Sequence, residues 1–217
     1  MSDQIKFKIN GKKVTAANGE TIWQVANRLG IEIPHLCYLP EKSYRADGNC
    51  RACMVEIEGE RTLAASCIRQ PTEGLVVNTA SERAKKSRKM VFELLQVDQP
   101  PRENSHDARS KFWDWVDKVE FSPSERYPAK SPPKPDKSHT AIAVHLDSCI
   151  QCNLCVRACR EVQSNDVIGM ANRGHQAKIV FDFDTAMGNS TCVACGECVQ
   201  ACPTGALIES NLLNEQG

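Results

Sequence analysis

The 217-residue sequence has few aromatic side chains, no excess of charge and no long apolar run. Aromatic residues make up 6% and hydrophobic residues 41% of the chain, which leaves little material for two large cores. The 27 basic and 27 acidic side chains cancel, so charge gives no reason to expect nucleic acid or a membrane surface as partner. No apolar run approaches the roughly 20 residues that a membrane span needs, and residues 1–6 contain no apolar signal core. We therefore expect a cytoplasmic protein with no membrane and no nucleic-acid partner.

Features of a small-molecule enzyme are also scarce. The five histidines are scattered, and none is spaced to form a ligand pair with another metal-binding residue type. No glycine-rich phosphate-binding loop follows a predicted strand. We interpret His35, two residues before Cys37, as structural. The chain by itself is therefore expected to have no catalytic residues and no substrate site.

Cysteine, in contrast, is abundant, with 12 residues that fall into three groups of four. In a reducing cytoplasm cysteines at such density bind metals more often than they form disulfides. The three groups use all 12 cysteines and leave none over, which argues against disulfides and against a catalytic thiol. The spacing within each group then decides between zinc and iron.

Residues 138–217 contain an internal repeat in which four cysteines recur 43 positions later. Both copies read C-x2-C-x2-C-x3-C, the run that binds [4Fe–4S] cubes in bacterial two-cluster ferredoxins. In that run three thiolates hold one cube, and the fourth, one helical turn further on, ligates the other cube. Zinc sites usually use two separated C-x2-C pairs, which disfavours zinc. The predicted ligands are Cys149, Cys152, Cys155 and Cys202 for the first cube, and Cys192, Cys195, Cys198 and Cys159 for the second.

The N-terminal group has a different spacing, C-x12-C-x2-C-x13-C. Four thiolates on a loop-rich edge of a small sheet suit a [2Fe–2S] cluster, although the spacing differs from the plant-type run. Tetrahedral zinc remains the alternative at this site. Gly48 would allow the close loop that a cluster requires. The predicted ligands are Cys37, Cys50, Cys53 and Cys67.

Residues 1–80 are predicted to form a small α+β domain. Asn10-Gly11 marks a hairpin turn, and Thr21 is placed to cap a helix. Short strands follow around 54–57, 63–65 and 75–77. One helix across a few mixed strands is the element order of a β-grasp domain. The expected apolar helix face is Ile22, Val25, Ala26 and Leu29.

Residues 81–137 are predicted to connect this domain to the repeat. A helix over 81–97 has Ser81 as its expected cap, and a short amphipathic helix surrounds 112–116, where the aromatic residues are expected to pack. Residues 122–137 hold five of the 11 prolines and are expected to be an extended linker. Residues 138–217 would then form a pseudo-twofold domain of the bacterial two-[4Fe–4S] type. The expected apolar face of the long helix is Ala84, Val91, Leu94 and Leu95.

Five further residues flank the cysteines. Positive charge and N–H donors beside a cluster raise its reduction potential, so nearby arginines are candidates for tuning the clusters, with solvated surface arginines as the alternative. Gly196 would allow close backbone approach to a cluster or only fit a turn. The candidate arginines are Arg45, Arg51, Arg157 and Arg160.

The residues around the first group resemble a known family. Segments 34–38 (PHLCY) and 48–56 (GNCRACMVE) resemble the [2Fe–2S] domain of the complex I large iron–sulfur subunit. That superfamily includes diaphorase subunits of NAD-reducing hydrogenases, iron-only hydrogenases and NAD-dependent formate dehydrogenases. Within it, segments 63–69, 105–113 and 159–170 most resemble the N-terminal part of the catalytic subunit of molybdenum- or tungsten-dependent formate dehydrogenase.

This resemblance implies an electron-transfer module or subunit of a cytoplasmic NAD-linked formate dehydrogenase. A pterin-metal catalytic domain or subunit would lie near the [4Fe–4S] domain, and a flavin/NAD-binding subunit near the [2Fe–2S] domain. Molybdopterin metal, FMN and NAD are expected only on those partners. The alternatives are a diaphorase subunit of an NAD-reducing hydrogenase and a free ferredoxin-type electron carrier.

The sequence departs from complex I relatives at a further [4Fe–4S] site that one histidine and three cysteines hold there. His106-Asp107 remains, but no cysteine follows it at the places where the ligands would fall. We therefore expect that additional cluster to be absent. The residues at those places are Ala108, Ser110, Lys111, Trp113 and Asp117.

Overall fold

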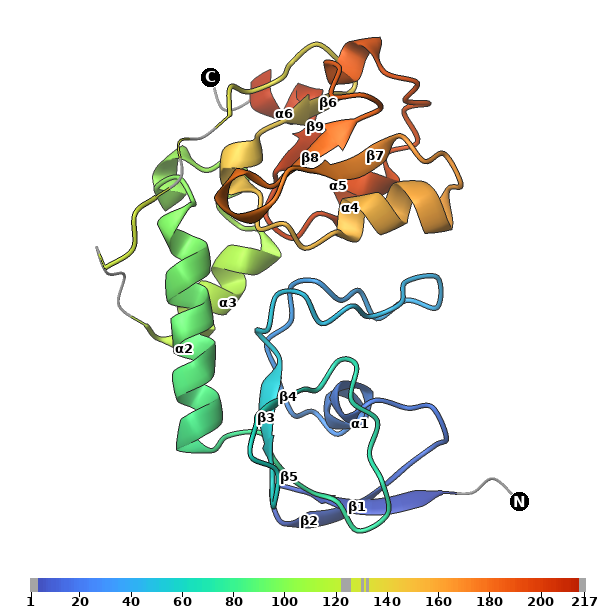
Figure 1. Ribbon diagram of the computed structural model, residues 1–217, viewed down its shortest axis with the longest axis vertical. Coiled ribbons are helices and arrows are strands. Elements are labelled where there is room, and N and C mark those ends of the chain that lie inside the picture. Colours follow the sequence, from blue (N-terminus) through green and yellow to red (C-terminus); the bar gives the residue numbers. More distant parts are fainter. Residues whose placement is uncertain (1–3, 122–125, 130, 132, 215–217) are drawn as a thin grey trace. The chain divides into compact units, whose positions relative to one another are not determined.

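The structure is a computed structural model that describes residues 4–121, 126–129, 131 and 133–214 (Figure 1). The chain divides into two compact units. Unit 1 comprises Met1–Pro40 and Ala46–Phe92, and unit 2 comprises Glu41–Arg45 and Glu93–Gly217. The boundary falls inside one long helix and around one short loop segment, so each unit is described by itself.

Unit 1 contains a five-stranded sheet in the order β2-β1-β5-β3-β4. β1 is antiparallel to β2 and parallel to β5. Asn10 and Gly11 both have positive φ, at 51° and 79°, as a tight two-residue hairpin requires, so the predicted turn is confirmed. The strands are β1 (Ile5–Ile9), β2 (Lys12–Ala16), β3 (Met54–Ile57), β4 (Ala64–Ala65) and β5 (Val76–Asn78).

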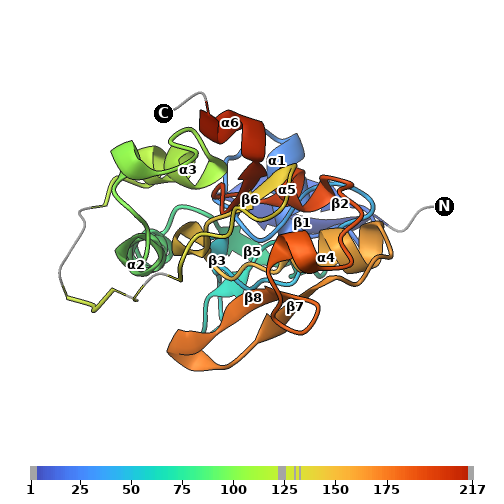
Figure 2. The ribbon, with the colours of Figure 1, turned by 90° about the horizontal axis from the view of Figure 1, so that it is seen from above.

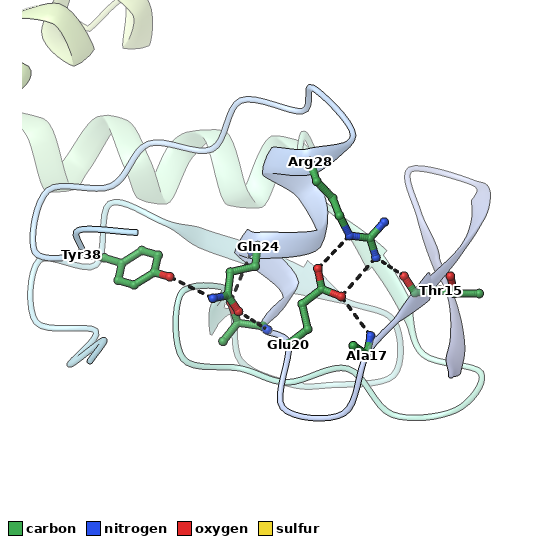
Figure 3. A network of polar contacts seen from close by, with 7 residues as sticks. Thr15, Ala17, Glu20, Gln24, Arg28 and Tyr38 are labelled. Atoms are coloured by element: carbon green, nitrogen blue, oxygen red, sulfur yellow. Dashed lines mark hydrogen bonds and ion pairs between the residues drawn. The ribbon is translucent and has the colours of Figure 1, made fainter. Parts of the chain in front are cut away.

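Helix α1 (Ile22–Arg28) starts at the predicted cap. The Thr21 side chain accepts a hydrogen bond from the Gln24 backbone N–H, and the Gln24 side chain accepts one from the Thr21 N–H at 2.8 Å, which completes a capping box. Arg28 pairs with Glu20 at 2.8 Å beside the same turn (Figure 3). The expectation that Leu29 lies on the buried face is wrong: it follows the last helical residue as the C-cap and is 44% exposed.

The core of unit 1 joins α1 to the sheet. Ile9, Ile22 and Val25 have no solvent-exposed surface, and Phe7 alternates with exposed lysines along β1. Two of the predicted ligands, Cys53 and Cys67, belong to this same core. The hydrophobic core of unit 1 therefore includes part of the first cysteine group.

Helix α2 (Glu82–Val97) begins where predicted, and the Ala84 N–H donates to Ser81 Oγ at 3.2 Å. The predicted face is partly correct: Ala84 is buried, Val91 and Leu95 are half-buried, and Leu94 is exposed. The buried residues are Ala84, Arg88 and Phe92, one turn apart, whereas Leu94 is 46% exposed. These residues lie at i, i+4 and i+8 on one face of the helix. Because one of them is an arginine, the hydrophobic pattern of the sequence does not indicate this face as buried.

In unit 2, two antiparallel strand pairs accompany the short helices that lie within each cysteine run. β6 (Ile142–Val144) pairs with β9 (Leu207–Glu209), and β7 (Ile168–Ala171) pairs with β8 (Lys178–Phe181), the orange hairpin of Figure 2. Pairing of β6 with β9 brings the beginning of the repeat to its end. The helices of this unit are α3 (Lys111–Val119), α4 (Leu154–Arg157), the π-helical turn Ala158–Val162, α5 (Glu197–Ala201) and α6 (Ser210–Asn214), with 3-10 turns at Arg102–Asn104, Leu146–Ser148, Gly174–Gln176 and Met187–Asn189.

The connector contains the predicted amphipathic helix as α3, in which Phe112 and Trp113 are buried and meet edge to face at 5.2 Å. The proline-rich segment 122–137 lies partly outside the described residues, at 122–125, 130 and 132.

Within the part of the chain that the structure describes, no helix has both the length and the apolar character needed to cross a bilayer. The predicted α+β fold class is confirmed, with a mixed sheet and one helix at its core in unit 1 and two antiparallel strand pairs with short helices in unit 2.

Candidate iron–sulfur sites

The four cysteines of the first group come together in unit 1. Cys37 lies in the loop after α1, Cys50 and Cys53 lie just before β3, and Cys67 follows β4. All four are 9% exposed or less. The Cys37 sulfur accepts hydrogen bonds from the Cys50 and Cys67 thiols, and Cys67 also contacts Cys53. The structure therefore gathers the predicted [2Fe–2S] ligands into one buried thiol group.

Hydrogen bonding and burial push the pKa values within this group apart. Donation by Cys50 and Cys67 lowers the pKa of the Cys37 thiol to about 2, and donation by Cys67 lowers the pKa of Cys53 to about 7. The pKa values of the donors Cys50 and Cys67 are raised by the same bonds and by burial. Iron binds thiolates, so a site that already favours thiolate at two positions is chemically suited to it.

Backbone geometry closes the loop around these thiols. The Cys50 N–H donates to Cys37 Sγ at 3.3 Å, the kind of N–H···S bond that stabilises a ligating thiolate. Gly48 has a φ of +66°, and a Cβ placed there would meet Ile68 Cδ1 at 3.0 Å. The left-handed conformation and the close neighbour both favour glycine, as the sequence predicts for this position.

The second and third groups line two cavities in unit 2. The Cys149 cavity is lined by Cys149, Cys152, Cys155 and Cys202, and the Cys192 cavity by Cys159, Cys192, Cys195 and Cys198. The two cavities are of similar size. Each cavity thus draws three cysteines from one copy of the repeat and one from the other, which is the grouping that the sequence predicts. Apolar side chains complete the walls, including Ile179 and Leu207 in one and Val167, Phe181 and Met187 in the other.

The repeat extends to the backbone of the two cysteine runs. Gln151 and Ala194, which are 43 positions apart, have φ of 55° and 56°. Their N–H groups donate to Cys149 Sγ and Cys192 Sγ at the same distance, 3.4 Å. Two loops of different sequence therefore fold to aim an N–H at the first sulfur of each run. A non-glycine residue in this left-handed conformation is uncommon, and it persists where the surrounding structure requires it.

Gly196 occupies a matching place in the repeat. It has a φ of +76°, and its counterpart Asn153 has a φ of 62°; each is the N-cap of the helix that follows. Nothing lies within 4 Å of a Cβ built on Gly196. Gly196 also lines the Cys192 cavity, so its left-handed turn lies beside the predicted ligands.

The pKa values in unit 2 reflect how close the sulfurs are to one another. Burial raises the pKa of Cys155, and repulsion from Cys152, Cys149 and Cys202 adds to it. Burial likewise raises the pKa of Cys198 to about 12, with repulsion from Cys192, Cys195 and Cys159. A bound cationic metal centre would relieve that repulsion, because it neutralises the thiolates that it ligates. Among the described residues, no three histidine, cysteine or acidic side chains meet closely enough to hold one single metal ion.

The candidate arginines differ in their surroundings. Arg45 pairs with Glu161 at 3.0 Å, and Arg160 pairs with Asp166 at 2.5 Å, both near the surface. Arg157 is only 2% exposed and donates to the main-chain carbonyls of Arg45 and Cys152 at 2.6 and 3.3 Å. Arg51 is exposed, with a φ of 59°.

Sequence reasoning missed Arg88, which lies 8% exposed on α2 and donates to the carbonyl of Met54, the residue after Cys53. A basic residue usually marks a solvated helix face. The signal that could have found it is its spacing, four residues from both Ala84 and Phe92.

At the segment where complex I relatives have their additional cluster, the side chains pack against one another, and the Ser110 hydroxyl and both ring nitrogens of His145 are buried without a hydrogen-bond partner among the described residues. The His106 ring lies against the ring of His145, with centroids 3.4 Å apart. Ser110 and Lys111 begin α3, and Trp113 Nε1 donates to Ser105 Oγ at 3.3 Å. Asp117 pairs with Arg102 at 2.8 Å, and the Ala108 carbonyl accepts from the same arginine at 3.0 Å.

Family models place an iron–sulfur domain on each unit. Residues 2–82 match the 2Fe-2S iron-sulfur cluster binding domain, and residues 148–206 match the 4Fe-4S dicluster domain. The chain is therefore a two-domain iron–sulfur protein, with a [2Fe–2S] ferredoxin-like domain followed by a [4Fe–4S] dicluster domain.

Individual relatives contain the same pair of domains. The NADP-reducing hydrogenase subunit HndD of Solidesulfovibrio fructosivorans is 35% identical over 97% of this chain and 37% of its own length. An NADH-quinone oxidoreductase subunit of Rhizobium meliloti is 31% identical over 94% of this chain and 24% of its own length. A chain of an NAD+-reducing [NiFe]-hydrogenase crystal structure in the H2-reduced state superposes with a TM-score of 0.86 and 25% identity, over 95% of this chain and 87% of that one. The iron–sulfur domains are related to those of these subunits, and the chain spans well under half the length of both curated relatives.

Proposed function

We propose that the chain relays electrons one at a time through one [2Fe–2S] and two [4Fe–4S] clusters within an NAD(P)-linked oxidoreductase. The observation that carries this proposal is that each of the three predicted ligand sets is gathered at one place in its unit. When bound, each cluster accepts and releases a single electron, which links two-electron chemistry at a substrate to stepwise reduction of a flavin.

The chain's own residues supply the sites. Cys37, Cys50, Cys53 and Cys67 would hold the [2Fe–2S] cluster; Cys149, Cys152, Cys155 and Cys202 the first cube; and Cys192, Cys195, Cys198 and Cys159 the second. The N–H groups directed at sulfur stabilise thiolate at each site. Apolar walls such as Ile179 and Phe181 exclude water from the cavities, which lowers the local dielectric.

For the complete enzyme we propose a cytoplasmic NAD-linked formate dehydrogenase. Its support is the likeness of segments 63–69, 105–113 and 159–170 to the formate dehydrogenase catalytic subunit. In this arrangement the dicluster domain would face a pterin-metal site, and the [2Fe–2S] domain would face a subunit that holds FMN and NAD.

A second candidate is a subunit of an NAD(P)-reducing hydrogenase. It is favoured by the match to a hydrogenase subunit over 97% of the chain and by the similarity to a chain of an NAD+-reducing hydrogenase structure. A free ferredoxin carrier is the third candidate. The curated relatives named above have these domains as parts of much longer chains, which favours a docked module over a free carrier.

The decisive experiment is anaerobic purification of the chain with its native partners, followed by NAD and NADP reduction assays with formate and with hydrogen. Iron and sulfide should both approach about ten per chain, and a zinc-bound N-terminal site would lower both values by about two. Formate-dependent reduction with a pterin-metal subunit present supports the formate dehydrogenase proposal. Hydrogen-dependent reduction alone supports the hydrogenase. Elution of the chain by itself near 24.0 kDa, without either activity, supports the free carrier.

A further inference from the structure

Arg88 is a buried cation at the base of the first cysteine group. Its side chain reaches from the middle of α2 to β3, where Nε and Nη2 both donate to the Met54 carbonyl, at 3.1 and 2.8 Å. Met54 directly follows Cys53, so this peptide belongs to the backbone that positions a predicted ligand. The residue as a whole is 8% exposed.

The Arg88 guanidinium is hydrogen-bonded to a main-chain carbonyl and, among the described residues, not to a carboxylate. Within the part of the chain that the structure describes, Arg88 has no carboxylate at ion-pair distance, and the acceptor of its hydrogen bonds is the Met54 carbonyl. Arg83, on the same helix, differs in both respects: its side chain is 49% exposed, and it lies 3.5 Å from Glu56. Arg83 is therefore a solvated arginine on the same helix with which the buried Arg88 can be compared.

A buried charge is costly unless an opposite charge lies close by. Burial lowers the pKa of Arg88, and the one neighbouring charge that opposes this effect is the Cys53 thiolate. Four thiolates around a [2Fe–2S] core make an anionic site, and reduction adds one more negative charge. The missing counter-charge of Arg88 is therefore supplied by the ligand group beside it.

We propose that Arg88 raises the reduction potential of the [2Fe–2S] cluster by providing its buried counter-charge and by fixing the Met54–Val55 peptide, which follows the predicted ligand Cys53. This inference rests on the proposed function, because it requires the cluster at this site. The positive charge stabilises the reduced cluster more than the oxidised one, since the reduced cluster is more negative. Arg88 is thus a positioning residue that acts through the ligand loop.

The test is a redox titration of the full chain with its clusters loaded, monitored by the electron paramagnetic resonance signal of the reduced [2Fe–2S] cluster. For R88Q we expect the reduction equilibrium to shift about tenfold toward the oxidised cluster, which is about 59 mV for one electron. The matched control R83Q removes the same charge from the same helix at a solvated site and should leave the potential unchanged. R88K keeps the charge and should restore most of the potential.

An R88Q potential equal to that of the wild type, with the cluster signal intact, would overturn the inference, as would an equal shift in R83Q. If R88Q fails to assemble the cluster, R88K decides: a tenfold loss despite the retained charge contradicts a role for the charge. Absence of any [2Fe–2S] signal from wild-type protein that contains its full iron would instead refute the proposed function.

Discussion

The two cysteine runs of the repeat have the same spacing, but single buried side chains make their surroundings different. Arg157 lies 43 positions before Gln200, yet Arg157 is 2% exposed and bonded to the Cys152 carbonyl, whereas Gln200 is exposed. Near the first cysteine group, Arg88 supplies a buried charge that the spacing of the cysteines does not predict. The ligands follow from spacing, whereas the electrostatic surroundings of each ligand set depend on residues brought in by the fold.

His145 is a second such residue, and it predicts a pH dependence of stability. It is 1% exposed, and burial lowers its pKa to about 4 from the usual 6.5, with repulsion from His106 and Lys137 added and attraction from Asp147 opposed to both. The unfolded chain therefore binds this proton more readily, so stability is lost as the pH falls from about 6.5 toward 4.

Between pH 7 and 5 we expect His145 to account for at most about 2 kcal/mol of lost stability. H145F keeps a ring against His106 but cannot titrate, so its stability should fall less over this range, as measured by urea unfolding. H175Q changes an exposed histidine and controls for acid lability that is common to all variants. A wild-type slope in H145F would contradict the argument.

At the scale of elements, the sequence predicts best where local chemistry decides the structure. The Asn10-Gly11 hairpin, the Thr21 cap and the strand at 54–57 agree with the structure because turn, cap and alternation depend on neighbouring residues. The buried face of α2 could not be predicted in this way. Tertiary packing buries Arg88 and Phe92 and leaves Leu94 exposed, and this outcome depends on contacts distant in the sequence, such as the hydrogen bond from Arg88 to the Met54 carbonyl.

The capping box of α1 provides a test at this scale. T21A removes the side-chain oxygen that accepts from Gln24, and we expect a loss of about 1 kcal/mol. For a unit of this size that lowers the melting temperature by roughly 4–8 °C, measurable by circular dichroism. T62A, at an exposed loop position, is the matched control. Equal melting temperatures of T21A and T62A would show that the cap contributes nothing.

At the scale of the whole molecule, the proposed order of clusters places the [2Fe–2S] cluster between the two cubes and the flavin. C53S removes one predicted ligand of the [2Fe–2S] cluster and leaves both cube sites intact. In the native complex we expect NAD(P) reduction to slow by about tenfold or more, while oxidation of formate or hydrogen with an artificial dye persists. The dye assay on the same preparation is the internal control. Equal loss of both activities would contradict this order.

The cavity linings have a consequence for how the protein is made. The N-terminal thiol group is complete once synthesis has passed Cys67. The Cys192 cavity, in contrast, needs Cys159 together with Cys198, and the Cys149 cavity waits for Cys202. Each cavity includes one cysteine from the other copy of the repeat. Neither cavity therefore has all four cysteines until both copies have left the ribosome. On the proposed ligand assignment, iron delivery to the two cubes would therefore wait for completion of the domain, whereas the N-terminal site could mature first.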